Sequence, residues 1–154
     1  MKNDLKVGDE IAVKPGDRKL EYRGAYFPVT DMVYLASGTG IVPILEQVRA
    51  VLPNGQSSVK SVTVIWMDED ATNFDVIADQ LEREYHKYTT KLAVACVVDN
   101  MRVNSLADNN GIVNAVPEFV PGTMAVLSGP RSMQRKAVSY LTSRGYPEDC
   151  ICML

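Results

Sequence analysis

The stretch YLASGTGIVPIL, Tyr34–Leu45, places the sequence GTG and a proline between two apolar runs. The run before it, MVYLAS at 32–37, is apolar throughout, which is typical of a strand buried on both faces. The run after it places Ile44, Val48 and Val51 on one face of a helix. The stretch therefore predicts a sharp turn from a buried strand into a helix, with glycine at the turn.

Two glycines and a proline give this turn its chemistry. Gly38 and Gly40 permit backbone angles that other residues resist, and they keep side chains away from an approaching group. The helix that follows directs unpaired N–H groups and the positive end of its dipole out of the turn, which suits a phosphate. On this interpretation a branched side chain at Gly40 would crowd that phosphate. Pro43 falls in the first helical turn, where a missing N–H is tolerated. The third position of the usual dinucleotide motif is Gly or Ala, so a purely structural turn stays open as the alternative.

Outward from this turn, β-branched runs recur at 61–67, 91–99, 123–129 and 150–154. Segments with helical spacing lie between them, marked by Val76, Ile77, Leu81 and Tyr85 in one helix and by Met133, Ala137, Val138 and Leu141 in the last. This alternation indicates an α/β fold, a doubly wound five-stranded parallel sheet with helices on both faces. Right-handed crossovers from a central first strand predict the strand order 3-2-1-4-5, with the turns at Gly38 and Gly129 side by side. Residues 103–120 read as a turn followed by a short helix or loop.

The first residues follow a different pattern. Apolar side chains alternate along the chain and PGD at 15–17 suggests a turn, which together favour antiparallel strands and a hairpin; these side chains are Leu5, Val7, Ile11, Val13, Leu20 and Tyr22. So few strands do not form an independently stable sheet. We therefore predict a short N-terminal β-hairpin unit at 1–28 and a separate domain at 29–154.

Composition narrows the classes of function. The net charge is −3 and the basic residues are scattered, which argues against a nucleic-acid partner. No apolar run approaches the ~20 residues of a membrane span, and the first ten residues lack the apolar segment typical of a signal peptide. Three cysteines favour a reducing, cytoplasmic compartment. No metal site is expected, because Cys150 and Cys152 would point to opposite faces of a strand and His86 is the single histidine.

Two motifs resemble a known family. YLASGTGIVPILEQVRAVL resembles the pyrophosphate loop and first helix of the ferredoxin–NADP reductase superfamily, in particular its NADH-cytochrome b5 reductase and nitrate reductase branch. AVLSGPRSMQRKAVSYLTSRGYPEDCICML is similar to that branch's ending, with its Cys-Gly-Pro-x-x-Met turn, helix and terminal strand. Residues 62–85 match its second strand and helix, with Asp75 where the family usually has Asp. The resemblance implies an NAD(P)H-binding domain, with 1–28 corresponding to the last strands of a flavin-binding barrel.

The resemblance also implies a set of site residues. The backbone from Gly38 to Ile41 would hold the pyrophosphate, and the nicotinamide side would be lined by Thr39, Gly40, Ser128 and Gly129. The further cofactor-binding positions would be Pro43, Pro130 and Met133. Ser128 stands where the family commonly has a cysteine beside the nicotinamide and the flavin. It is the catalytic candidate, as a hydrogen-bond donor, although a strand-end serine without a role remains the alternative.

Asp68 is the candidate for nucleotide choice. A carboxylate at the end of the second strand can accept hydrogen bonds from a ribose 2′-OH and repel a 2′-phosphate. No Arg or Lys lies between Met67 and Leu81, so NADH is favoured over NADPH. The alternative is a solvated acidic loop before a helix capped by Thr72, with Asp75 three residues on.

The family's flavin motif, Arg-x-Tyr-Ser/Thr, is missing. The only Arg-x-Tyr, at 83–85, lies in a predicted helix and is followed by His86. The sequence thus predicts the NADH-binding half of an FAD-dependent oxidoreductase, which positions NADH for hydride transfer to a flavin on another domain of the same polypeptide. The electron acceptor would be a haem domain, a ferredoxin or a small molecule. FAD would belong to the full-length protein, and the isolated chain would be inactive. The alternative is a nucleotide-binding or interaction module without turnover.

Overall fold

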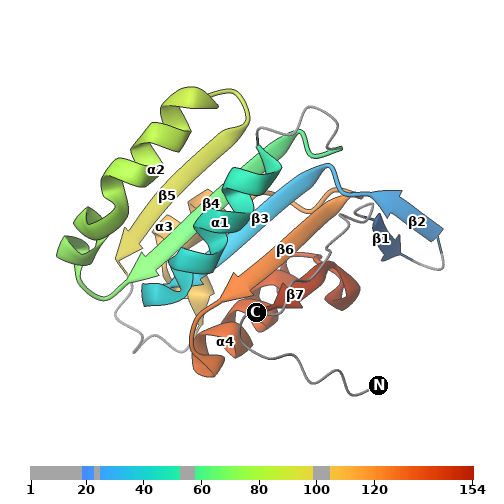
Figure 1. Cartoon of the computed structure of the whole chain (residues 1–154). Helices are drawn as coiled ribbons and strands as arrows, with labels where there is room; N and C mark the ends of the chain where they lie inside the picture. The colour runs from blue at the N-terminus through green and yellow to red at the C-terminus, as the bar shows by residue number, and fades with distance from the viewer. Residues whose placement is uncertain (1–18, 23–24, 53–57, 99–104) are drawn as a thin grey trace, which may run out of the picture.

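The computed structural model describes residues 19–22, 25–52, 58–98 and 105–154. Its centre is a five-stranded, all-parallel sheet in the order β5-β4-β3-β6-β7 (Figure 1). Numbered within the sheet, this is the predicted order 3-2-1-4-5, so the predicted fold is confirmed. The elements are β1 Lys19–Tyr22, β2 Ala25–Pro28, β3 Asp31–Ser37, α1 Ile41–Val51, β4 Ser61–Asp68, α2 Asp75–Lys87, β5 Leu92–Val98, α3 Asn110–Ala115, β6 Thr123–Ser128, α4 Arg131–Ser143 and β7 Ile151–Met153.

The register of the sheet brings the ends of its central strands together. Ser37, the last residue of β3, lies opposite Met67 of β4, and Ala36 lies opposite Ser128, the last residue of β6. All three strands run in the same direction, so their carboxyl ends share one edge of the sheet. The segments that leave β3 and β6 therefore begin as neighbours.

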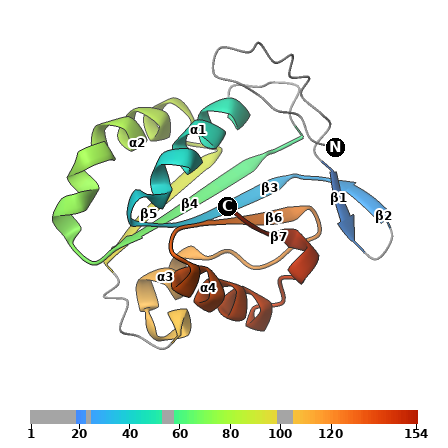
Figure 2. The same ribbon diagram turned by 60° about the horizontal axis from the view of Figure 1, so that its bottom comes forward.

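Helices cover both faces of the sheet. Helices α1 and α2 lie on one face, and α3 and α4 lie on the other (Figure 2). The side chains of β3 alternate between two buried cores, with Tyr34 and Ala36 in the core beneath α1 and Val33 and Leu35 in the core beneath α4. This alternation is the two-residue period of a strand. It explains why the whole run is apolar, because each face of β3 is covered.

Three details complete the comparison with the sequence-based expectations. Strands β1 and β2 form an antiparallel pair, as expected for this segment, and the predicted PGD turn lies outside the described residues. Tyr85 of α2 is 43% exposed rather than part of the core, because α2 packs on an edge of the sheet through Leu81 and its neighbours. Within 103–120, where a turn and a short helix or loop were expected, the structure has the short helix α3. Within the described ranges, none of the helices combines the length and apolar character needed to cross a membrane.

Candidate functional site

The turn after β3 is a short 3₁₀ helix, Gly38–Gly40, that continues directly into α1. Gly38 has φ +56°, in the region that residues with a side chain avoid. A Cβ built on Gly38 would meet nothing within 4 Å. Glycine is therefore needed at this position for the backbone angle, and the space beside it is open.

Gly40 is needed for a different reason. Its φ of −58° suits any residue. A Cβ on Gly40 would lie 2.7 Å from the carbonyl carbon of Ser128 and 3.0 Å from the Gly129 nitrogen, and it would overlap the Ser128 carbonyl oxygen. The expectation that a side chain here would crowd a phosphate is wrong in its cause, because the first group met is the backbone at the end of β6. The close approach confirms that the two glycine turns lie side by side.

The turn after β6 is equally confined. Gly129 has φ +151°, and a Cβ there would lie 2.7 Å from the Cε of Met133 and 3.1 Å from the Cβ of Ser37. The side chain of Gln134 donates to the Gly129 carbonyl at 3.0 Å and to the Leu154 carbonyl at 2.9 Å. The two turns therefore form one packed unit at the carboxyl edge of the sheet, tied to the end of the chain beyond β7.

The helices that start at these two turns have no side-chain cap. Neither Ser37, which precedes the 3₁₀ helix, nor Pro130, which precedes α4, makes a side-chain capping hydrogen bond. Elsewhere the side chains of Asp70, Ser105 and Asn109 cap helical segments. The first amides of a helix have no partner within it, so they can donate to water or to an anion such as a phosphate.

The predicted cofactor-binding residues fall into two sets in the structure. Thr39, Pro43 and Pro130 are exposed beside the turns. The Ile41 amide donates within the turn to the Gly38 and Thr39 carbonyls, and its side chain is 2% exposed. Met133 is fully buried beneath Gly129. The side chains of Ile41 and Met133 therefore support the turns from below.

Ser128, the predicted catalytic residue, ends β6 beside the glycine turn of β3. It is 5% exposed, and its carbonyl faces the α-carbon of Gly40. The structure thus places it at the junction of the two turns. The role of its hydroxyl stays a prediction.

Asp68 ends β4, the strand next to β3, and takes part in its own loop. One carboxylate oxygen accepts from the Asp70 amide at 3.1 Å and from the Asn73 side chain at 2.9 Å. The helix that follows is capped by Asp70 rather than by the expected Thr72, because Asp70 accepts from the amide of Thr72 at 2.9 Å and from its hydroxyl at 2.8 Å. These two hydrogen bonds lower the pKa of Asp70, and the one from the Thr72 amide has the larger effect.

Comparison with known proteins identifies the fold. No family model matches the chain, and no curated protein matches it. Among solved structures, the CS-b5R domains of human Ncb5or in the NAD⁺ form superpose with a TM-score of 0.65 and 19% identity over 81% of this chain. Ferredoxin–NADP⁺ reductase from Plasmodium falciparum gives 0.62 and 15% over 80%, and a flavohemoglobin from Malassezia yamatoensis with bound FAD and haem gives 0.60 and 18% over 83%.

The chain has the fold of the nucleotide-binding domain of these reductases. It spans 36% of the Ncb5or chain, 32% of the flavohemoglobin and 51% of the Plasmodium reductase. The resemblance seen in the two glycine motifs is therefore confirmed at the level of the fold.

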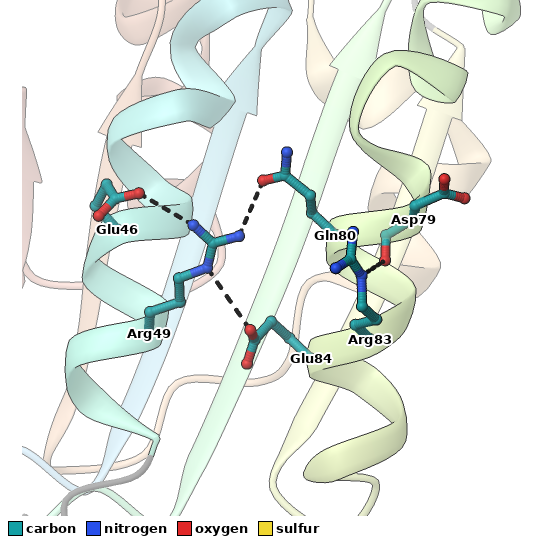
Figure 3. Close-up of polar contacts among 6 residues, drawn as sticks. All are labelled: Glu46, Arg49, Asp79, Gln80, Arg83 and Glu84. Atoms are coloured by element: carbon teal, nitrogen blue, oxygen red, sulfur yellow. Dashed lines mark hydrogen bonds and ion pairs between the residues drawn. The ribbon is translucent and has the colours of Figure 1, made fainter.

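A hollow between α1 and α2 is a different kind of feature. It has a volume of about 350 Å³ and is lined by Arg49, Gln80, Arg83, Glu84 and Lys87. Arg49 of α1 donates to Gln80 at 2.9 Å and lies 3.6 Å from the Glu84 carboxylate, both on α2 (Figure 3). These contacts join the two helices well down α1 from the glycine turn. We interpret the hollow as the polar contact surface between α1 and α2, separate from the glycine turns.

Proposed function

We propose that this chain is the NAD(P)H-binding half of a flavin-dependent oxidoreductase, which holds a nicotinamide nucleotide across the two glycine turns and presents it to a flavin on another domain. The observation that carries the proposal is the contact of Gly40 with the Ser128–Gly129 backbone. It joins the two turns at the point where the order of the sheet reverses, which is where open α/β sheets bind their ligands.

The chemistry of the turns fits a dinucleotide. The uncapped start of the helix after Ser37, with open space beside Gly38, suits the pyrophosphate. The amides of Gly38, Thr39 and Gly40 are its proposed donors, because the Ile41 amide already donates within the turn. The turn at Gly129 and Pro130 offers a surface without bulky side chains to the flat nicotinamide ring.

The bound nucleotide would supply the hydride, and the protein would supply its position. Ser128, at the junction of the turns, is the proposed hydrogen-bonding partner of the nicotinamide. Met133 fills the space beneath Gly129 and Gln134 holds its carbonyl, so both would fix the floor on which the ring lies.

We propose NADH as the preferred nucleotide. Asp68 is the last residue of β4, on the side of the switch point where the adenosine ribose would extend, and one of its carboxylate oxygens lies outside the contacts of its own loop. That oxygen could accept from a ribose hydroxyl, and its charge would oppose a 2′-phosphate. FAD would belong to the flavin domain, and the electron acceptor would be a haem domain, a ferredoxin or a small molecule.

Titration of the ¹⁵N-labelled chain with NADH, NADPH and inorganic pyrophosphate tests this proposal. NADH should bind weakly, because part of the pocket would lie on the flavin domain, and it should shift the amides at 38–40 and those of Ser128 and Gly129. Pyrophosphate should shift mainly the first group. A titration that leaves both groups unshifted, or that moves only residues around Arg49, would overturn the proposal.

Catalysis requires a second test. The isolated chain should be colourless and should fail to reduce ferricyanide with NADH. Addition of the polypeptide's flavin domain should bring yellow colour and reductase activity. NADH binding at the turns without any gain of activity on addition of that domain would favour a nucleotide-binding module without turnover.

A further inference from the structure

A tryptophan from the neighbouring strand holds the glycine turn. Trp66 of β4 is 3% exposed and belongs to the core beneath α1. Its indole N–H donates to the carbonyl oxygen of Gly38 at 3.0 Å. The ring of Phe74 packs edge-on against the indole, with 4.9 Å between the ring centroids. The indole is thus fixed both by packing and by its hydrogen bond to the turn.

This hydrogen bond sets the orientation of one peptide unit. The Gly38 carbonyl also accepts from the Ile41 amide, so two donors hold it. The described residues contain no cis peptide bond, and in a trans peptide the C=O and the following N–H point in opposite directions. Because the carbonyl of Gly38 points to the buried indole, the N–H of Thr39 points away from the core, and Thr39 is exposed.

We infer that Trp66 is a positioning residue of the site, which fixes the Thr39 amide in the direction that a pyrophosphate oxygen requires. The inference rests on the proposed function. Glycine permits many backbone angles, so the unit between Gly38 and Thr39 could rotate more freely if the Ile41 amide were the one remaining donor to the Gly38 carbonyl. Trp66 would remove that freedom before the ligand arrives, and preorganisation of this kind raises affinity.

Two replacements of Trp66 separate the hydrogen bond from the packing. Trp66→Phe keeps an aromatic ring but removes the donor and some volume. Substitution of β-(3-benzothienyl)alanine at position 66 keeps the shape of the indole and replaces its N–H by sulfur. Phe74→Leu is the matched control, because it removes the ring packed against the indole and leaves the indole N–H in place.

Calorimetry with NADH and with inorganic pyrophosphate supplies the first measurement. Both replacements of Trp66 should weaken binding about five- to tenfold, which is the scale of one hydrogen bond, while Phe74→Leu should bind as the wild type does. Equal affinity of the benzothienyl protein and the wild type would overturn the inference. A wild-type chain that binds neither probe would instead refute the proposed function.

NMR of the ligand-free chain supplies a measurement that does not depend on binding. The ¹³C′ resonance of Gly38 should shift in the benzothienyl protein, and the Thr39 amide should show exchange broadening. Unchanged signals at both atoms would overturn the inference whatever the affinities are.

Trp66 also reports on its own position. It is the single tryptophan of the chain, and it emits where reduced nicotinamide absorbs. NADH bound at the turns should therefore quench its fluorescence. Binding of NADH by calorimetry without quenching would place the nucleotide elsewhere and refute the role of Trp66.

Discussion

Replacement of Gly40 by alanine is the sharpest test of how the two turns are joined. The new Cβ would overlap the Ser128 carbonyl oxygen and lie 2.7 Å from the carbonyl carbon, where ordinary contacts begin at 3.4 Å. The obstacle is backbone, which cannot rotate away as a side chain can. Relief requires α1 and the end of β6 to move apart.

The magnitude follows from two opposing terms. Insertion of a methyl group into a packed interior costs about 1–3 kcal/mol, and a backbone neighbour places this case at the upper end. The backbone angles of Gly40 suit alanine, which returns about 0.4–1 kcal/mol through the unfolded chain. We expect Gly40→Ala to lose about 2 kcal/mol of unfolding free energy in urea denaturation followed by circular dichroism.

Gly38→Ala is the matched control. It places alanine at φ +56° with open space around the Cβ, so it should lose only the ~1 kcal/mol of a left-handed residue. NADH binding should fall further in Gly40→Ala than in Gly38→Ala, because only the former separates the two turns. An alanine at Gly40 that leaves the chain as stable as the wild type would refute the argument from close approach.

The remaining predictions concern selectivity, ionisation and the floor of the site. Asp68→Asn keeps the acceptor for Asn73 and removes the charge, so calorimetry should show a smaller preference for NADH over NADPH at unchanged stability. Burial raises the pKa of Tyr146 from 10.0 to about 12. The neutral phenol therefore contributes its full share of the unfolding free energy below pH 10, and this share is lost as the pH rises to 12. Urea denaturation should show about 2–3 kcal/mol more loss over that range in the wild type than in Tyr146→Phe. Gln134→Met releases two carbonyls and should lose about 1–2 kcal/mol of stability by the same assay. An unaltered midpoint of urea denaturation would show that the two hydrogen bonds of Gln134 do not stabilise the fold.

The fold could be predicted because its signals are local. Each parallel strand is a β-branched run, each crossover is helical, and a right-handed crossover leaves few orders for five strands. The glycines marked the turns for the same reason, since a strand that passes sharply into a helix requires them. The termini of the elements were less certain, as α3 shows.

The parts that were missed depend on contacts between distant segments. In the sequence, Gly40 looked like a residue that makes room for a ligand. In the structure its neighbour is the backbone at the end of β6, which lies there because β3 pairs with β6, a long-range contact that the local sequence does not reveal. The hydrogen bond of Trp66 has a backbone carbonyl as its acceptor, and no pattern in the sequence names that carbonyl. A tryptophan in a predicted buried strand was the available signal, because a buried indole N–H needs a partner.

The cap at Asp70 was missed for a smaller reason. Both Asp70 and Thr72 are good capping residues, and the sequence alone does not say at which of them the helix begins. The structure begins a 3₁₀ turn at Ala71 before α2, so Asp70 takes the position that was expected for Thr72.

The pairing of β3 with β6 has a consequence for how the protein folds. Asp31 pairs with Thr123 across most of the chain, so this contact closes a long loop, and such contacts form late and slowly. The contact between Gly40 and Ser128 depends on it. A chain that has assembled only β3, α1 and β4 would possess the first glycine turn without its counterpart. Binding of a nucleotide across both turns would then select the completed sheet and slow its unfolding, which makes the ligand a folding partner of the whole domain.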